Sequence, residues 1–92
     1  MESDHQRLFL AEHRLPQATD EELELLRAAL VEACARVTER GNSVRYLRST
    51  FLPRRERLLS YFLAGDASVV RTVAEIALAP MDVLELAIDL EN

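Results

Sequence analysis

The alternation of hydrophobic and polar positions along the chain predicts four strands and two helices. Apolar residues at every second position, or in short unbroken runs, are typical of strands, whereas spacings of three and four residues are typical of helices. We expect strands over residues 7–15, 44–52, 58–64 and 83–90 and helices over residues 20–40 and 67–78. Pro16, Gly41 and Pro80 fall at the ends of these segments, where residues that interrupt regular structure belong.

The two helix starts carry the clearest local signals. Thr19 and Glu22 have the spacing of a capping box, in which each side chain binds the backbone N–H of the other residue. Asp66 is the expected N-cap of the second helix. The apolar stripe of the first helix is formed by Leu23, Leu26, Leu30, Cys34 and Val37.

The order strand-helix-strand-strand-helix-strand predicts a ferredoxin-like α+β fold, with a four-stranded antiparallel sheet and two helices on one face. The first and third strands are central in that fold, and here both, "LFLA" and "LLSYFLA", are apolar on both faces. Because two helices cover only one face, the apolar residues of the other face predict a partner. We expect a homodimer that packs sheet against sheet, as in a dimeric α+β barrel.

The length of 92 residues suits one domain, which we place over residues 7–92 after a disordered N-terminus at residues 1–6. Cys34 is the only cysteine, so an intramolecular disulfide is excluded. The first residues lack the basic head and apolar run of a signal peptide, and no apolar stretch approaches the length of a membrane span. We therefore expect a soluble cytoplasmic protein without a membrane partner.

Charge is unevenly distributed along the chain. The formal net charge of −5 argues against binding to nucleic acid. Every basic residue is an arginine, and residues 40–57 carry six arginines and one acid, Glu56. Such asymmetry can steer an anion or an acidic protein toward one region. Arg54, Arg55 and Arg57 lie between two strands and are expected at a solvated hairpin tip.

Three segments of the chain, "LFLAEHRLPQATDEELELL", "VRYLRSTFLP" and "LAGDASVVRTVAEIALAPMDVLELAIDL", resemble a family of small bacterial domains of unknown function. The resemblance implies a ferredoxin-like fold and a dimer, and one member of that family binds nickel. The third strand of the family usually reads Cys-x-Phe-Glu-Ala-Pro, whereas this chain has "SYFLAG". The thiol and the carboxylate of the family pattern are therefore not carried over.

Glu12 is the candidate acid–base residue. It shares one face of the first strand with Leu8 and Leu10, so it would lie in an apolar cavity if that face looked toward the helices. A carboxylate in such a setting is a candidate general base. The alternative is a structural ion pair with Arg45 or Arg48 on a neighbouring strand.

The candidate ligand-binding residues are Tyr46, Arg48, Arg45 and Tyr61. Strict alternation along the second strand places Tyr46 and Arg48 on one face and Arg45 on the other. An arginine flanked by aromatic rings suits a planar anionic or aromatic small molecule. The same residue types are enriched at protein interfaces, so a dimer contact is the alternative interpretation.

The chain offers few donors for a transition metal, which prefers converging imidazole and thiolate groups. His13 is the weak candidate ligand, and its alternative role is that of a solvent-facing strand residue. Cys34 falls on an apolar helix stripe, where a lone cysteine behaves as a small hydrophobe. We therefore predict no cofactor, and nickel is an alternative that only the family resemblance implies.

These observations favour a small homodimeric ligand-binding or accessory protein with a polar-lined pocket near Glu12, Tyr46 and Arg48. One alternative is a cofactor-independent enzyme of monooxygenase, cyclase or isomerase type that uses Glu12 as its acid or base. The other alternative is a nickel-binding protein like the family member.

Overall fold

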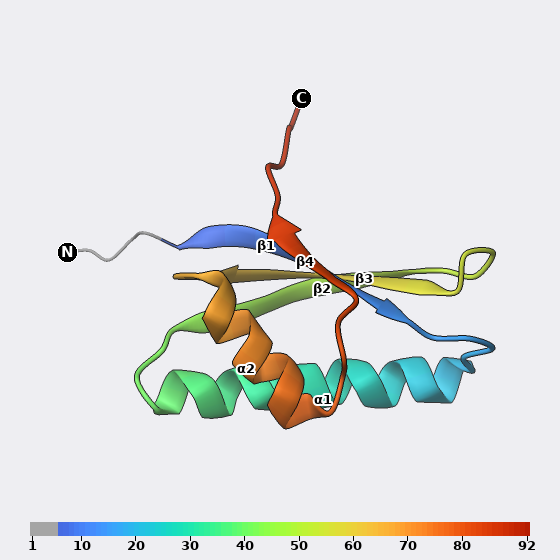
Figure 1. Ribbon diagram of the computed structural model, residues 1–92, viewed down its shortest axis with the longest axis horizontal. Helices are drawn as coiled ribbons and strands as arrows, with labels where there is room; N and C mark the ends of the chain where they lie inside the picture. The colour runs from blue at the N-terminus through green and yellow to red at the C-terminus, as the bar shows by residue number, and fades with distance from the viewer. Residues whose placement is uncertain (1–5) are drawn as a thin grey trace.

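The computed structural model describes residues 6–92 and has the element order βαββαβ (Figure 1). The elements are β1 (Arg7–Arg14), α1 (Asp20–Glu39), β2 (Val44–Leu52), β3 (Arg57–Ala64), α2 (Ala67–Ala77) and β4 (Val83–Leu86). Neither of the described helices is long and apolar enough to cross a membrane.

The prediction of a disordered N-terminus falls mostly on residues 1–5, which lie outside the described residues. Gln6 is described, and its side-chain amide donates hydrogen bonds to the hydroxyl and carbonyl oxygens of Ser43, at 2.9 and 3.3 Å.

The four strands form one antiparallel sheet in the order β2-β3-β1-β4. The first and third strands are therefore central, as their apolar sequences predict. Both helices lie on the same side of the sheet, below it in Figure 1. This arrangement confirms the expected ferredoxin-like α+β fold.

Both predicted helix starts form as their capping residues require. The Thr19 hydroxyl accepts a hydrogen bond from the Glu22 backbone N–H at 3.1 Å, and the Glu22 carboxylate accepts one from the Thr19 N–H at 2.9 Å. At the start of α2, the Asp66 carboxylate accepts from the backbone N–H groups of Ser68 and Val69. These side chains satisfy backbone donors that have no partner within the helix.

The last strand is shorter than the hydrophobic pattern predicts. β4 ends at Leu86, whereas the alternation continues through Leu90. β4 pairs with β1, and its residue Leu86 lies opposite Phe9. Because β1 begins only two residues earlier, at Arg7, the neighbouring strand runs out, and the hydrogen bond from the Ala87 N–H to the Leu8 carbonyl, at 3.0 Å, is the last between these segments.

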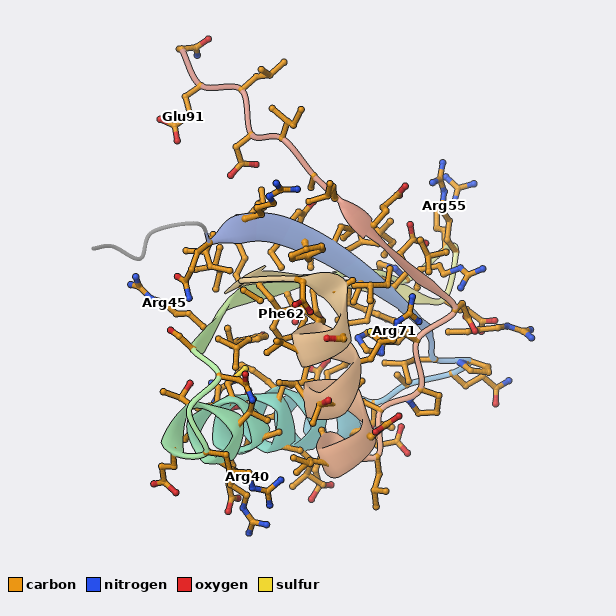
Figure 2. The ribbon with its side chains drawn as sticks, turned by 60° about the vertical axis from the view of Figure 1, so that its left-hand side comes forward. Arg40, Arg45, Arg55, Phe62, Arg71 and Glu91 are labelled. Carbon is orange, nitrogen blue, oxygen red and sulfur yellow. The ribbon has the colours of Figure 1, made fainter. Side chains whose placement is uncertain are left out.

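The hydrophobic core lies between the sheet and the two helices. Phe62 of β3 lies at the centre of this core and is 1% exposed; it is labelled between the sheet and the helices in Figure 2. Its ring meets the ring of Tyr46 edge to face, with 5.7 Å between the centroids. The helices contribute Leu30, Ala33, Cys34, Val37, Val70 and Val73 to this core.

The opposite face of the sheet, here called the open face, carries no helix. Alternate residues of β1 and β3 point to it, and their large apolar side chains are only partly buried. They are Leu8, Leu10, Leu59, Tyr61 and Leu63. The expectation that the second face of the sheet is also apolar is confirmed for these two strands.

Candidate functional site

A groove of about 570 Å³ lies between the N-terminal half of α1 and the edge strand β2. Its apolar lining comes from Leu23, Leu47, Phe51 and Leu58. Its polar lining comes from Asp20, Glu24, Arg27, Tyr46, Arg48 and Ser49. This α1–β2 groove therefore contains two of the residues that the sequence suggests for ligand binding, Tyr46 and Arg48.

An irregularity in β2 decides which way these two residues face. Tyr46 pairs with Phe62 and Arg48 pairs with the next residue, Tyr61, so Leu47 is an extra residue in the ladder. Tyr46 therefore lies on the helix-facing side, and Arg48 lies on the open face. The prediction that Tyr46 and Arg48 share one face is wrong, because it assumed alternation without a bulge.

The hydroxyl groups of Tyr46, Ser49 and Ser60 form a chain from the groove into the core. The Tyr46 and Ser49 oxygens are 2.7 Å apart, and the Ser49 and Ser60 oxygens are also 2.7 Å apart. Ser60 is fully buried, and among the described residues its hydroxyl has Ser49 as its hydrogen-bond partner. A buried hydroxyl proton without an acceptor would cost about 1–3 kcal/mol. Ser60 therefore donates to Ser49, which donates to Tyr46, and the proton of Tyr46 is left free for a ligand.

The charged residues of the groove largely balance one another. Arg27 Nε donates to Glu24 Oε2 at 2.9 Å, and this hydrogen bond and the positive charge hold the pKa of Glu24 below its usual value. Asp20 adds a second acid to the lining, whereas the guanidinium of Arg48 lies over Tyr61 on the open face. The groove is therefore suited to a small ligand of low charge rather than to a polyanion.

Glu12 does not lie in this groove. It occupies the open face of β1, opposite Leu59 of β3 and Val83 of β4, so the expectation of a cavity between sheet and helices is wrong for this residue. Its Oε1 is 4.0 Å from Arg57 Nε, and Arg57 also donates to Asp82 at 2.6 Å. Glu12 thus follows the ion-pair alternative, with Arg57 in place of the expected Arg45 or Arg48. The physical basis for an acid–base role in a cavity is removed.

The side chains of Arg45, Arg48 and Tyr61 lie on the open face, although Arg48 also contributes atoms to the groove lining. The guanidinium carbon of Arg48 lies 4.3 Å from the centre of the Tyr61 ring, which is a cation–π contact. Arg45 pairs with Leu63 and projects outward from the start of β2 (Figure 2). The four predicted ligand-binding residues are therefore divided between two faces, with Tyr46 alone on the helix side.

His13 is buried against the helix side, so the alternative that it faces solvent is wrong. Only 2% of it is exposed, and its Nδ1 lies 3.1 Å from the carbonyl oxygen of Pro80, which an N–H at that position can reach. Its Nε2 is buried without a hydrogen-bond partner among residues 6–92. Burial lowers the pKa of His13, although the Pro80 carbonyl and the charge of Asp82 act in the opposite direction.

The described residues do not bring a set of nickel ligands together. Within residues 6–92, no group of three or more histidine, cysteine, aspartate or glutamate side chains is placed to hold a metal. The Nδ1 of His13 is already occupied by Pro80. Cys34 is buried in the core, and burial raises the pKa of its thiol to about 11, so the thiol is protonated at neutral pH and is a poor nucleophile.

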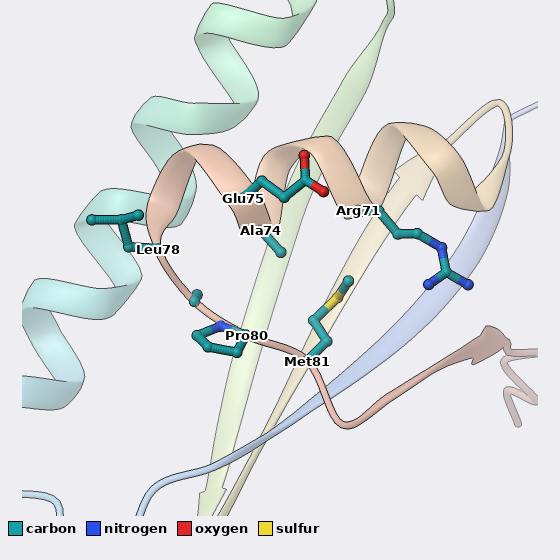
Figure 3. Close-up of a pocket in the computed structure, with 7 residues that line it drawn as sticks. Arg71, Ala74, Glu75, Leu78, Pro80 and Met81 are labelled. Atoms are coloured by element: carbon teal, nitrogen blue, oxygen red, sulfur yellow. The ribbon is translucent and has the colours of Figure 1, made fainter.

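A second groove, also of about 570 Å³, lies beside α2 and the segment that leads to β4 (Figure 3). Ala74, Ala79, Pro80 and Met81 give it an apolar lining, and Arg71 and Leu78 lie at its opposite ends in the figure. Leu78 has a left-handed backbone, with φ of 56°, which ends α2 and leaves the side chain 87% exposed. This groove was not predicted from the sequence, in which Pro80 after an apolar helix end is the signal for a turn here.

Comparisons with other proteins bear on the fold. No protein-family profile matches the chain, and no curated protein matches it in sequence. The crystal structure of SCO4226 from Streptomyces coelicolor A3(2) is similar, with a TM-score of 0.73 and 19% sequence identity. The similarity covers 92% of this chain and 99% of that chain. At this identity the likeness supports the ferredoxin-like fold and carries no statement about function.

Proposed function

We propose that the protein is a small homodimeric ligand-binding protein whose α1–β2 groove binds a small molecule with an apolar body and an acceptor oxygen. The observation that carries the proposal is the hydroxyl chain that ends at Tyr46. Its direction is set by the buried Ser60, so Tyr46 presents a hydrogen-bond donor to the groove. A fixed donor next to apolar walls is the usual composition of a small-molecule site.

The lining of the groove supports an aromatic or aliphatic molecule with one acceptor oxygen and at most one negative charge as the ligand class. Leu23, Phe51 and Leu58 offer apolar contact, and Tyr46 offers one donor for an oxygen. The positive charge on the groove side is that of Arg27, which is paired with Glu24, whereas the Arg48 guanidinium lies over Tyr61 on the open face. Asp20 and Glu24 disfavour a ligand with several negative charges.

The open face of the sheet supports the dimer. Leu8, Leu10, Leu59, Tyr61 and Leu63 leave large apolar side chains partly exposed on two central strands. A contiguous apolar surface on a sheet is usually covered by another protein surface. Packing of two open faces against each other covers it with the same residues on both sides, as a two-fold interface requires. A cytoplasmic location is part of the same proposal, because a chain with one cysteine fits a compartment in which disulfides are rare.

The ligand proposal is tested with benzoate, an apolar ring with one carboxylate, titrated into ¹⁵N-labelled protein and followed by NMR. We expect concentration-dependent shifts for backbone amides around Leu23, Tyr46 and Ser49. Tyr46→Phe should weaken benzoate binding about tenfold, since a hydrogen bond to a charged group is worth about 1.5 kcal/mol.

Tyr61→Phe is the matched control, because it removes the same hydroxyl group from the open face and should leave the affinity for benzoate unchanged. Equal affinities of both variants and the unaltered protein, or shifts confined to other regions of the chain, would contradict the proposed site. Far-UV circular dichroism confirms that both variants are folded.

A further inference from the structure

The C-terminal segment, residues 87–91, has the sequence pattern of a strand but lies outside the sheet. Ile88 and Leu90 are 85% and 91% exposed, and they alternate with Asp89 and Glu91. The segment rises from the end of β4 on the open-face side, away from both helices (Figure 1), and Glu91 lies near its far end in Figure 2. In a strand with this alternation the apolar side chains usually pack against another surface, but here the side chains of Ile88 and Leu90 are exposed.

Among residues 6–92, the segment has no neighbouring strand with which to continue the ladder on its own sheet. Its neighbour β1 begins at Arg7, so the chain beyond Ala87 has passed the end of the strand with which β4 pairs. The strand order places β2 at the opposite edge of the sheet from β4. To reach its own β2, the segment would have to cross the whole open face.

The outer edge of β2 is a complementary surface. β2 is nine residues long, and among residues 6–92 it pairs with β3 on one side only. An unpaired strand edge of this length is a template for another extended chain. Arg45 and Arg48 lie exposed on the open-face side of this edge, and the α1–β2 groove lies on its other side.

A strand that adds to the outer edge of β2 can turn either of its two faces toward the groove, and the charges of the side chains favour one of these orientations. In one orientation Ile88 and Leu90 lie toward the apolar lining of the groove, and Asp89 and Glu91 lie toward Arg45 and Arg48. In the other orientation both carboxylates would lie beside Asp20 and Glu24 of the groove, where like charges repel. Because a shift of one residue exchanges the two faces of a strand, this difference selects the first orientation.

We propose that residues 87–91 of one subunit add to the outer edge of β2 in a second copy of the chain and cover that copy's α1–β2 groove with Ile88 and Leu90. This inference rests on the proposed homodimer, in which the two open faces meet and bring each C-terminal segment to the partner's side. The groove is then completed by the partner subunit, so each binding site contains residues of both copies.

The test is disulfide cross-linking of double variants, Asp89→Cys combined with either Arg45→Cys or Arg48→Cys. The native Cys34 is buried and does not interfere, because its thiol stays protonated at the pH of the experiment. After mild oxidation we expect a covalent dimer on a non-reducing gel for at least one of the two combinations. The control, Asp89→Cys with Arg71→Cys, places the second thiol on the exposed side of α2 and should give no covalent dimer.

Absence of a covalent dimer from both combinations, or a cross-link within one chain, would overturn the inference. Analytical ultracentrifugation of the reduced variants separates this failure from failure of the dimer itself. A dimer that sediments normally but does not cross-link refutes only the placement of residues 87–91. A monomer refutes both the inference and the homodimer on which it rests.

Discussion

Glu12 and His13 are neighbours in the sequence, yet their side chains enter opposite environments. Glu12 lies on the open face beside Arg57, and His13 lies 98% buried beneath the segment that carries Pro80. Alternation along β1 separates the two correctly, but it does not say which face the helices cover. The burial of a histidine with one unpartnered nitrogen has a measurable consequence for stability.

Stability should fall as the pH drops below about 6.5, the ordinary pKa of a histidine in an unfolded chain. Burial holds the pKa of His13 lower in the folded state, so below pH 6.5 the unfolded chain binds more protons than the folded one. The contribution of the neutral His13 to the free energy of unfolding is complete above pH 6.5. It is lost as the pH falls toward the pKa of His13 in the folded state, and the free energy of unfolding then decreases by at most about 1.4 kcal/mol per pH unit. Urea unfolding followed by circular dichroism at pH 7.5, 6.5 and 5.5 measures it.

His13→Asn is the matched variant for this experiment. Its amide can still donate to the Pro80 carbonyl from the position of Nδ1, but it does not titrate. We expect the free energy of unfolding of this variant to change less over the same pH range. An equal decline in both proteins would show that another group is responsible.

At the scale of the elements, most boundaries follow from local signals in the sequence. The capping box at Thr19, the N-cap Asp66 and the turn residues around Pro53 act within a few residues of themselves, so the helix starts and the hairpin were predictable. The bulge at Leu47 was not, because it arises from the fit of β2 to β3 and leaves no mark in the alternation.

Thr19→Ala should lower the free energy of unfolding by about 1 kcal/mol. The variant removes the hydroxyl that accepts a hydrogen bond from the Glu22 N–H, and it leaves that donor without a partner in the first turn of α1. Urea denaturation at pH 7 measures the change in the midpoint.

Thr19→Ser is the control for this helix cap, because serine keeps the hydroxyl and should retain most of the stability. If Thr19→Ala and Thr19→Ser unfold at the same urea concentration, the hydrogen bond at the start of α1 contributes nothing measurable.

At the scale of the whole molecule, the sheet has two apolar faces and the helices cover one of them. The core between sheet and helices is closed around Phe62, while Leu10 and its neighbours on the open face are only partly buried. Burial of the covered face against the helices stabilises the folded chain, and the apolar side chains of the open face are the reason for proposing a partner subunit.

Sedimentation velocity at micromolar protein concentration should give the mass of a dimer, and Leu10→Asp should give a folded monomer. The substitution places two carboxylates at the centre of the proposed interface, where burying unpaired charges is costly. Leu78→Asp introduces the same charge at an exposed site on the helix side and should remain dimeric. An unaltered protein that sediments as a monomer would refute the sheet-to-sheet dimer.

The sequence by itself determined the order and type of the elements, the helix caps and the central position of β1 and β3. Each of these depends on local backbone preferences or on the amount of apolar surface that a segment must bury. Only the tertiary structure decided that Tyr46 and Arg48 face opposite sides, that Glu12 pairs with Arg57, that His13 is buried and that β4 stops at Leu86. These features depend on the register between strands and on which face of the sheet the helices cover. The pattern of hydrophobic and polar residues along the sequence specifies neither of these.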